Sequence, residues 1–507
     1  MVCLMVAPAV TVLAAKLPAF DALMATPAKP TCASGTHGKI RSEPHQTLYD
    51  GAGLGSAPTK PPGGTVMNEI DRRTFVGVAA ALAAAEARAA EMPVRVGIIG
   101  AGSRGSSLLR PLLDLPGIEV AAICDLDDNA AAKARKTCVD AGKPEPAIYA
   151  SGPEDFRRLL DAEDLHGVIV ATPWEWHATM GVAALEAGIA AAIEVPAAIT
   201  VDECWQLVET AERTGVSATM LENWVYRREP LAVLNIARAG LLGEIVYCES
   251  GYGHDVRAVM FDARVADKGE LQWRGKHSIT RDGNLYPTHQ FAPVAMLMDI
   301  NHGTRIEALI ATGGVSRGMN QYAVDRWGPD HPNAKRDFAN SDRANVLVQL
   351  EDGRTALNFH DIQSWHPRDD GHKYQGTKGM VRWPFPGEGS IWVQERHWDG
   401  KAVDARRWHS LNPFLDEFDH PIWKMYSERA RRFGHSGADW MELRGWTESL
   451  RNGTPPPVSI VDAVTWSAIG PLSEESIAGK STSVAMPDFS KGKWKTNPKF
   501  ELQWKWG

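Results

Sequence analysis

A strand, a glycine-rich turn, a helix and a second strand that ends on an acidic residue fall within residues 94–125. The mostly apolar run 94–99 is typical of a buried strand, and the sequence GAGSRG at 100–105 follows it directly. A second apolar run, 119–124, ends on Asp125. Glycines between a strand and a helix let the backbone approach a pyrophosphate at the helix N-terminus. This order therefore predicts a dinucleotide-binding domain.

The residues of this motif have separate expected roles. Gly100 makes the tight turn, Gly102 admits the pyrophosphate, and Gly105 lets the helix pack closely on the strand. Asp125 lies where a carboxylate can accept hydrogen bonds from ribose hydroxyls. Because this charge would repel a 2′-phosphate, the motif favours NAD over NADP as the cofactor.

Strands and helices continue to alternate as far as residue 221, which indicates a parallel sheet covered by helices. Ligands bind such sheets at the carboxyl ends of the strands. We expect four side chains that follow strands to lie along this rim: Asp125, Trp174, His177 and Glu194.

The N-terminal region contains a pattern typical of a twin-arginine export signal. Arg72 and Arg73 precede the apolar run 76–85, and the small residues of Ala87-Arg88-Ala89 stand where a signal peptidase cuts. We expect a signal peptide at 67–91, translation from Met67, and a periplasmic or secreted protein. Residues 1–66 would then be a disordered or mis-assigned upstream extension. The alternative is a basic start to an alanine-rich helix.

Composition excludes several other classes of protein. The net charge of −8, from 54 Lys+Arg against 62 Asp+Glu, argues against nucleic-acid binding, which needs basic patches. The six cysteines form no CxxC pair, so neither a zinc ribbon nor a disulfide framework is expected. No run after residue 92 is long and apolar enough to span a bilayer. The 18 tryptophans suit either core packing or ring platforms for a sugar.

At Glu194-Val195-Pro196 the chain resembles the Gfo/Idh/MocA family of NAD(P)-dependent sugar oxidoreductases, although members usually carry lysine where this chain has Val195. With this departure, the chain is most similar to glycoside hydrolase family 109, the NAD-dependent α-N-acetylgalactosaminidases. The matching segments are EVPAAITVDE at 194–203, MLENWVY at 220–226, WR at 273–274, NLYPTH at 284–289, GTKG at 376–379 and PDF at 487–489.

The resemblance implies an α/β fold of two domains. A Rossmann domain at 92–222 would precede an α/β domain at 223–507 whose open, mostly antiparallel sheet covers the nicotinamide. The residue pattern agrees, because segments 245–252, 305–311, 344–350 and 354–360 alternate like strands. Helices are expected at 228–239 and 287–298, and two late helices at 439–450 and 460–477 would pack back on the body.

The resemblance also assigns the site. His289 is the expected base at the oxidised sugar carbon, with Tyr286 as its partner in proton transfer. The remaining substrate contacts would be Tyr252, Arg274 and Thr288. Besides the glycine motif and Asp125, the cofactor would contact Ser103, Arg104, Trp174, His177, Glu194, Val195, Asn223 and Tyr286. The candidates for supporting roles beside the site are His254, Asp255, His435 and Asp439.

One family tyrosine before GTKG has no counterpart at the matching place, and His366, Arg368 or Tyr374 are candidates to replace it. His366, Asp369, Asp370 and His372 lie close together in sequence, but a solvated loop is the better interpretation, and we expect no metal site. The default expectation for assembly is a homodimer paired through the open sheet.

The family mechanism implies that bound NAD oxidises carbon 3 of a small glycoside, so that the group on carbon 1 can leave by elimination before water adds. A cofactor regenerated in each turnover suits an exported enzyme. The alternatives are a sugar dehydrogenase, which the valine at 195 disfavours, and a non-catalytic protein that binds NAD and a sugar.

Overall fold

The computed structural model describes residues 93–261, 269–398, 400 and 406–502. The expected signal peptide at 67–91 and the upstream segment 1–66 lie outside these residues. Within the described residues, no helix combines the length and the apolar character needed to cross a membrane.

The first sheet has six parallel strands in the order β3-β2-β1-β4-β5-β6. Its strands are β1 (Val94–Ile99), β2 (Ile118–Cys124), β3 (Ala147–Tyr149), β4 (Gly167–Val170), β5 (Ala190–Ile193) and β6 (Ala218–Met220). The inner strands β4 and β5 are buried at every position, as a sheet covered on both faces requires. This order is that of a Rossmann domain and confirms the predicted class.

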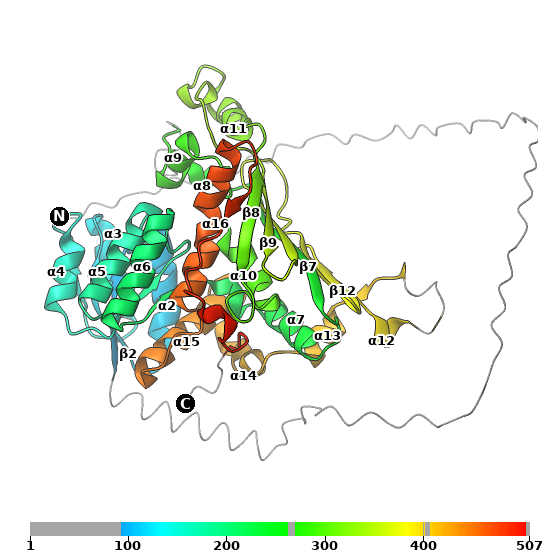
Figure 1. Ribbon diagram of the computed structural model, residues 1–507. Coiled ribbons are helices and arrows are strands. Elements are labelled where there is room, and N and C mark those ends of the chain that lie inside the picture. The colour runs from blue at the N-terminus through cyan, green and yellow to red at the C-terminus, as the bar shows by residue number, and fades with distance from the viewer. Residues whose placement is uncertain (1–92, 262–268, 399, 401–405, 503–507) are drawn as a thin grey trace, which may run out of the picture. The chain divides into compact units, whose positions relative to one another are not determined.

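Five helices connect these strands and surround the sheet (Figure 1). They are α2 (Ser103–Asp114), α3 (Asp128–Asp140), α4 (Asp155–Ala162), α5 (His177–Glu186) and α6 (Val201–Thr214). A capping box between Thr200 and Glu203 starts α6, and Gly215 in a left-handed conformation ends it. These local signals fix where α6 begins and ends.

The second sheet has nine strands in the order β14-β13-β12-β11-β7-β10-β9-β8-β15. Only the pair β7 and β10 is parallel, so the sheet is mostly antiparallel, as predicted. The strands are β7 (Ile245–Gly253), β8 (Ile306–Thr312), β9 (Ala344–Leu350), β10 (Thr355–Asp361), β11 (His372–Gly376), β12 (Gly379–Trp383), β13 (Ser390–Val393), β14 (His409–Ser410) and β15 (Val484–Ala485).

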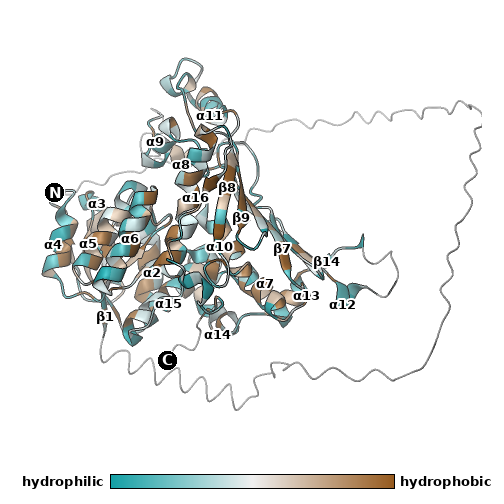
Figure 2. Cartoon of the chain, in the orientation of Figure 1, coloured by the Kyte–Doolittle hydropathy of each residue, from teal (hydrophilic) through white to brown (hydrophobic). Residues whose placement is uncertain are grey.

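Helices of the C-terminal half pack on this sheet, on the Rossmann domain, or, in the case of α16, on both. Helix α10 (Thr288–Leu297), buried at all its positions, lies on β7 and β10. Helix α16 (Ile460–Ala478) contacts β8 as well as α6 and β6, and α15 (Ala438–Asn452) packs on α2 and β1. Apolar segments are frequent on the strands and on these helices in Figure 2. The C-terminal helices therefore join the two sheets through shared apolar contacts.

The remaining α-helices are α7 (Arg228–Arg238), α8 (Arg257–Met260), α9 (Trp273–Thr280), α11 (Gly318–Trp327), α12 (Gln394–His397), α13 (Asn412–Glu417) and α14 (Pro421–Ala430). Two short 3₁₀ turns contribute to the site described below, Trp174–Trp176 before α5 and Asn223–Tyr226 after β6.

Candidate active site

A cavity of about 920 Å³ opens where the carboxyl ends of the parallel strands meet the second sheet. Every residue predicted for the site lines it except Gly105 and Thr288. The Rossmann side contributes the glycine loop, Asp125 and Glu194, and the other side contributes Tyr252, Arg274, Tyr286 and His289. The structure therefore brings the predicted cofactor and substrate residues to one place.

The glycine loop leaves room for a ligand at one position only. A Cβ atom at Gly100 would lie 2.6 Å from the carbonyl oxygen of Ala171, and one at Gly105 would lie 1.9 Å from that of Gly100. A Cβ atom at Gly102 would meet no atom within 4 Å. Gly102 also starts α2, where no side chain caps the helix N-terminus. The loop thus fits a pyrophosphate, which backbone N–H groups and the helix dipole would bind.

Asp125 connects the loop to the end of β2. Its carboxylate accepts hydrogen bonds from the backbone N–H of Ala101 at 2.6 Å and of Asp127 at 2.8 Å. A carboxylate has further lone pairs, and Asp125 lines the cavity. It is therefore placed to accept hydrogen bonds from a ribose diol, and its charge opposes a 2′-phosphate.

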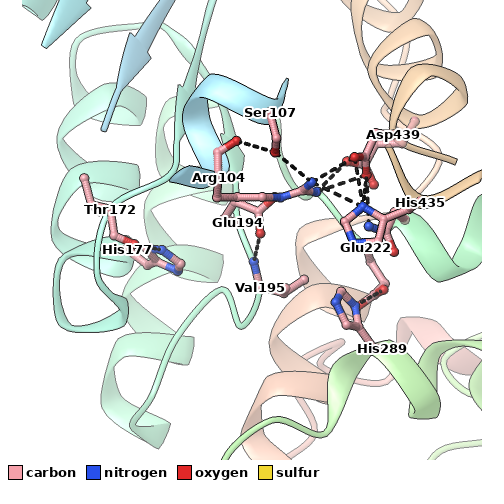
Figure 3. A network of polar contacts seen from close by, with 12 residues as sticks. Arg104, Ser107, Thr172, His177, Glu194, Val195, Glu222, His289, His435 and Asp439 are labelled. Carbon is pink, nitrogen blue, oxygen red and sulfur yellow. Dashed lines mark hydrogen bonds and ion pairs between the residues drawn. The ribbon is translucent and has the colours of Figure 1, made fainter. Parts of the chain in front are cut away.

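Arg104 lies among three carboxylates rather than alone at the loop (Figure 3). Its guanidinium nitrogens lie 2.6 Å from Glu194, 2.9 Å from Asp439 and 3.8 Å from Glu442. Burial alone would disfavour the charge, but these carboxylates raise the pKa of Arg104 well above its usual value. Arg104 therefore joins α2 both to the end of β5 and to α15.

Asp439 is the centre of this network. It is fully buried and also bonds Nδ1 of His435, at 2.9 Å, and the amide of Asn223, at 3.0 Å. Burial opposes its charge, but His435 and Arg104 lower the pKa of Asp439 below its usual value. Two residues considered only for supporting roles thus fix Arg104 and Asn223 at the cavity wall.

His177 supports the cofactor side through backbone contacts. Its Nδ1 lies 2.7 Å from the carbonyl oxygen of Pro196, and its Nε2 lies 2.9 Å from that of Thr172. Burial lowers the pKa of His177. Both ring nitrogens face backbone carbonyl oxygens, and a neutral imidazole can donate to only one of them. The ring therefore packs between the loops after β4 and β5, where neither nitrogen is placed for acid–base chemistry.

Tyr286 and His289 form the acid–base pair of the cavity. The hydroxyl of Tyr286 lies 3.1 Å from Nε2 of His289. Burial raises the pKa of Tyr286 well above its usual value, against the opposing charge of Arg274. Burial also lowers the pKa of His289. At neutral pH the phenol therefore keeps its proton and donates to an imidazole that can accept it.

Aromatic rings and the guanidinium of Arg274 form the substrate side of the cavity. Trp174 stacks on Tyr286 with ring centroids 5.7 Å apart, and Tyr252 lies 4.9 Å from Tyr286. The guanidinium of Arg274 lies 5.0 Å from the ring centres of Trp174 and Tyr286. Among the described residues Arg274 has no ion-pair partner, so its planar fork is available for ligand oxygens.

Two predicted contacts lie outside the cavity lining. Gly105 acts through packing, and Thr288 is fully buried, with a hydroxyl that has no hydrogen-bond partner in the described part of the chain.

His254 packs its ring 4.7 Å from that of Tyr252, and burial with nearby cations lowers its pKa to about 4. Asp255 is paired with Arg257.

None of the three candidates for the missing tyrosine lines the cavity. The hydroxyl of Tyr374 is 2.8 Å from Nδ1 of His372, and Arg368 is paired with Asp370 at 2.8 Å. Arg368 comes nearest, because its guanidinium lies 5.5 Å from the ring centre of Tyr252. These pairings also occupy much of the possible metal cluster, and the described residues include no group arranged to hold a metal ion.

Glu222, which follows β6 and is fully buried, was not among the predicted site residues. Its Oε1 lies 2.7 Å from Nδ1 of His289. Gln272 and the helix α8 residues Ala258 and Val259, which lie at the cavity wall, were not predicted either. The only sequence signal for Glu222 was its place within MLENWVY, directly before the predicted cofactor contact Asn223.

Fold and site define a two-domain protein in which a glycine loop suited to a dinucleotide and a group of aromatic rings line the same cavity. Residues 94–221 match the family described as "Oxidoreductase family, NAD-binding Rossmann fold". Residues 226–496 match "Glycosyl hydrolase 109, C-terminal domain". The chain therefore belongs to glycosyl hydrolase family 109 and is a glycoside hydrolase.

Proteins that are similar over most of the chain support this family membership. A "Glycosyl hydrolase family 109 protein" of Stenotrophomonas maltophilia (strain K279a) is 37% identical over 454 residues, 85% of this chain and 97% of the relative. An "Alpha-N-acetylgalactosaminidase" of Tannerella forsythia is 36% identical over 416 residues, 79% of this chain and 87% of the relative. The solved "Levoglucosan dehydrogenase, complex with NADH and levoglucosan" shares the fold, with a TM-score of 0.58, 21% identity, and coverage of 78% of this chain and all of that one.

The two glycines of the loop should respond differently to alanine. Gly102→Ala should leave the thermal unfolding temperature of the nucleotide-free protein unchanged and strongly weaken NAD binding in calorimetry, because its methyl group fills only the ligand space. Gly105→Ala should lower the unfolding temperature, because its methyl group would overlap a backbone carbonyl. Unchanged NAD affinity in Gly102→Ala would contradict this assignment of the loop.

Proposed function

We propose that this glycosidase cleaves α-N-acetylgalactosaminides with a tightly bound NAD that is regenerated in each turnover. The observation that carries the proposal is the Tyr286–His289 pair, which faces the same cavity as the glycine loop. The substrate class is also supported by the printed activity of the Tannerella forsythia relative.

The carboxylates of the cavity argue against the usual glycosidase mechanism, in which two carboxyl groups flank the scissile bond. Among the described residues that line the cavity, the carboxylates are those of Asp125, Asp127 and Glu194. Asp125 holds the glycine loop and Glu194 is paired with Arg104. Acid–base groups beside the rings are instead a phenol and an imidazole, which suit proton transfer at a sugar hydroxyl.

The cofactor would lie along the Rossmann rim. Gly102 and the N-terminus of α2 would hold its pyrophosphate, Asp125 its ribose, and Glu194 and Val195 the nicotinamide side. When bound, NAD supplies a reversible hydride acceptor at carbon 3 of the sugar, which makes the hydrogen on carbon 2 acidic.

Tyr286 and His289 would carry out the proton transfers. As the sugar hydroxyl gives its proton to the oxygen of Tyr286, the phenol proton passes to Nε2 of His289, and the return step reverses this transfer. The raised pKa of Tyr286 means that a lasting phenolate is costly. We assign storage of the proton to His289, where the nearby Glu222 carboxylate raises the pKa against the lowering effect of burial. Val195 is buried and apolar, so it cannot take the role that lysine has in the related dehydrogenases.

Substrate binding would use the rings and Arg274. Aromatic rings cover the apolar face of a sugar, and Tyr252 and Trp174 stand beside the acid–base pair. The guanidinium of Arg274, which has no ion-pair partner in the described part of the chain, suits hydroxyl groups or an acetamide oxygen. Export by the twin-arginine route is part of the proposal, because this route carries folded proteins with their cofactors; its support is the sequence 71–91 alone.

Hydrolysis in heavy water tests the mechanism. When an aryl α-N-acetylgalactosaminide is hydrolysed in D₂O, we expect deuterium on carbon 2 of the released sugar and no accumulation of NADH, because the carbon-2 proton exchanges while the redox cycle closes. Mass spectrometry and absorbance at the NADH band measure the two quantities. His289→Ala should slow hydrolysis by about 10²–10⁴-fold.

His409→Ala is the matched control, because His409 is a half-buried histidine on β14 at the far edge of the second sheet. It should keep the activity of the unchanged protein. Steady formation of NADH with the glycosidic bond intact would indicate the dehydrogenase alternative. Product sugar without deuterium at carbon 2 would contradict the redox mechanism.

The export step has its own test. Replacement of Arg72 and Arg73 together by Lys should retain the protein in the cytoplasm, and the exported protein should begin close to Ala90. Cell fractionation and N-terminal sequencing measure both results. An exported protein that still carries residues 1–66 would contradict the proposed signal and start site.

A further inference from the structure

Glu222 holds the ring of His289 from the side opposite the cavity. Its Oε1 lies 2.7 Å from Nδ1, and Tyr286 lies 3.1 Å from Nε2 on the other side of the ring (Figure 3 shows the Glu222 contact). We propose that Glu222 is a positioning residue, which keeps His289 in the tautomer that leaves Nε2 free and stabilises the imidazolium formed during catalysis. The inference rests on the proposed function, in which His289 stores the proton.

The tautomer follows from the partners of the imidazole. Tyr286 retains its proton at neutral pH and donates it, so Nε2 of His289 must accept. A neutral imidazole carries one proton, which then lies on Nδ1 and points to the Glu222 carboxylate. An imidazole fixed in this way by a carboxylate is the arrangement that gives serine hydrolases their base.

The surroundings of Glu222 leave His289 as its natural counter-charge. Glu222 is fully buried, and no lysine or arginine of the described chain forms an ion pair with it. Its other contact is the backbone N–H of Trp224, at 3.1 Å from the same oxygen, and Oε2 has no hydrogen-bond partner among these residues. A buried carboxylate is costly without a cation, so a proton on His289 gives this carboxylate its missing partner.

Other charged or titratable groups surround Glu222 and His289, and they remain in place when Glu222 is replaced. Those that interact electrostatically with His289 or Glu222 are Glu194, Tyr252, His254, Tyr286, His435 and Glu442. Arg274 lies next to Tyr252 and Tyr286. Glu222 raises the pKa of His289 against the larger effect of burial, which lowers it. Removing the carboxylate should therefore move this pKa further down.

Glu222→Gln tests the positioning role, because the amide preserves size and removes the charge. We expect kcat to fall by about 10²–10⁴-fold, as when the orienting carboxylate of a triad becomes an amide, with KM changed less than about threefold since the substrate contacts remain. The acid limb of the kcat/KM profile should move to lower pH, because the base now loses its proton more readily. Glu222→Asp, which keeps the carboxylate, should recover part of the lost rate.

Nitrogen-15 NMR of labelled histidine provides a readout without substrate. In the unchanged protein, His289 should show its proton on Nδ1. In Glu222→Gln the amide can donate to Nδ1, so the proton should move to Nε2. Because this measurement needs no turnover, it tests the Glu222 inference even if the redox mechanism fails in heavy water.

Asp462→Asn is the matched control, because Asp462 is a buried carboxylate paired with His302 at 3.4 Å and is absent from the cavity lining. It should lower the unfolding temperature and leave the pH profile and the His289 signals unchanged. If Glu222→Gln keeps the acid limb and the Nδ1–H signal of the unchanged protein, or if Glu222→Asp recovers nothing, Glu222 has only a structural role.

Discussion

The contact of Arg104 with Glu194 and Asp439 is the interaction on which the site depends. One guanidinium joins the first turn of α2, the end of β5 and helix α15, which are far apart in the sequence. Removing one member of a buried ion pair leaves the other charge without compensation, which is more costly than the pair is stabilising. The glycine loop and α15 are therefore held in one arrangement, beside the cavity that opens between the Rossmann rim and the second sheet.

The residues proposed for proton transfer and those proposed to hold the cofactor lie on different halves of the molecule. The Rossmann side offers a loop for the cofactor and an apolar Val195 where related dehydrogenases carry lysine. The other side offers Tyr286 and His289, with Glu222 behind them at the end of the first sheet. We infer that the acid–base role has moved from a single lysine to this relay, which can hold a proton while the glycosidic bond breaks.

The sequence was most informative where local chemistry determines structure. The glycine motif and the alternation of strands and helices predicted the Rossmann sheet, and the family segments, NLYPTH above all, supplied most of the cavity-lining candidates. Strands β11 to β15 were missed because they are short and the first of them, HKYQG, is largely polar. Glu222 and the partners of Arg104 could not be predicted, because their contacts join residues 67 to 335 positions apart. Thr288 was placed in the cavity by resemblance, but the start of α10 buries it.

The identity of the nucleotide released from denatured protein tests the central claim most directly. The purified protein should release close to one NAD per chain, and the same amount should remain bound after many turnovers in buffer without added nucleotide. Asp125 at the ribose position and the closed redox cycle both require this result. Release of NADP, or full hydrolytic activity from protein that carries no nucleotide, would contradict the account.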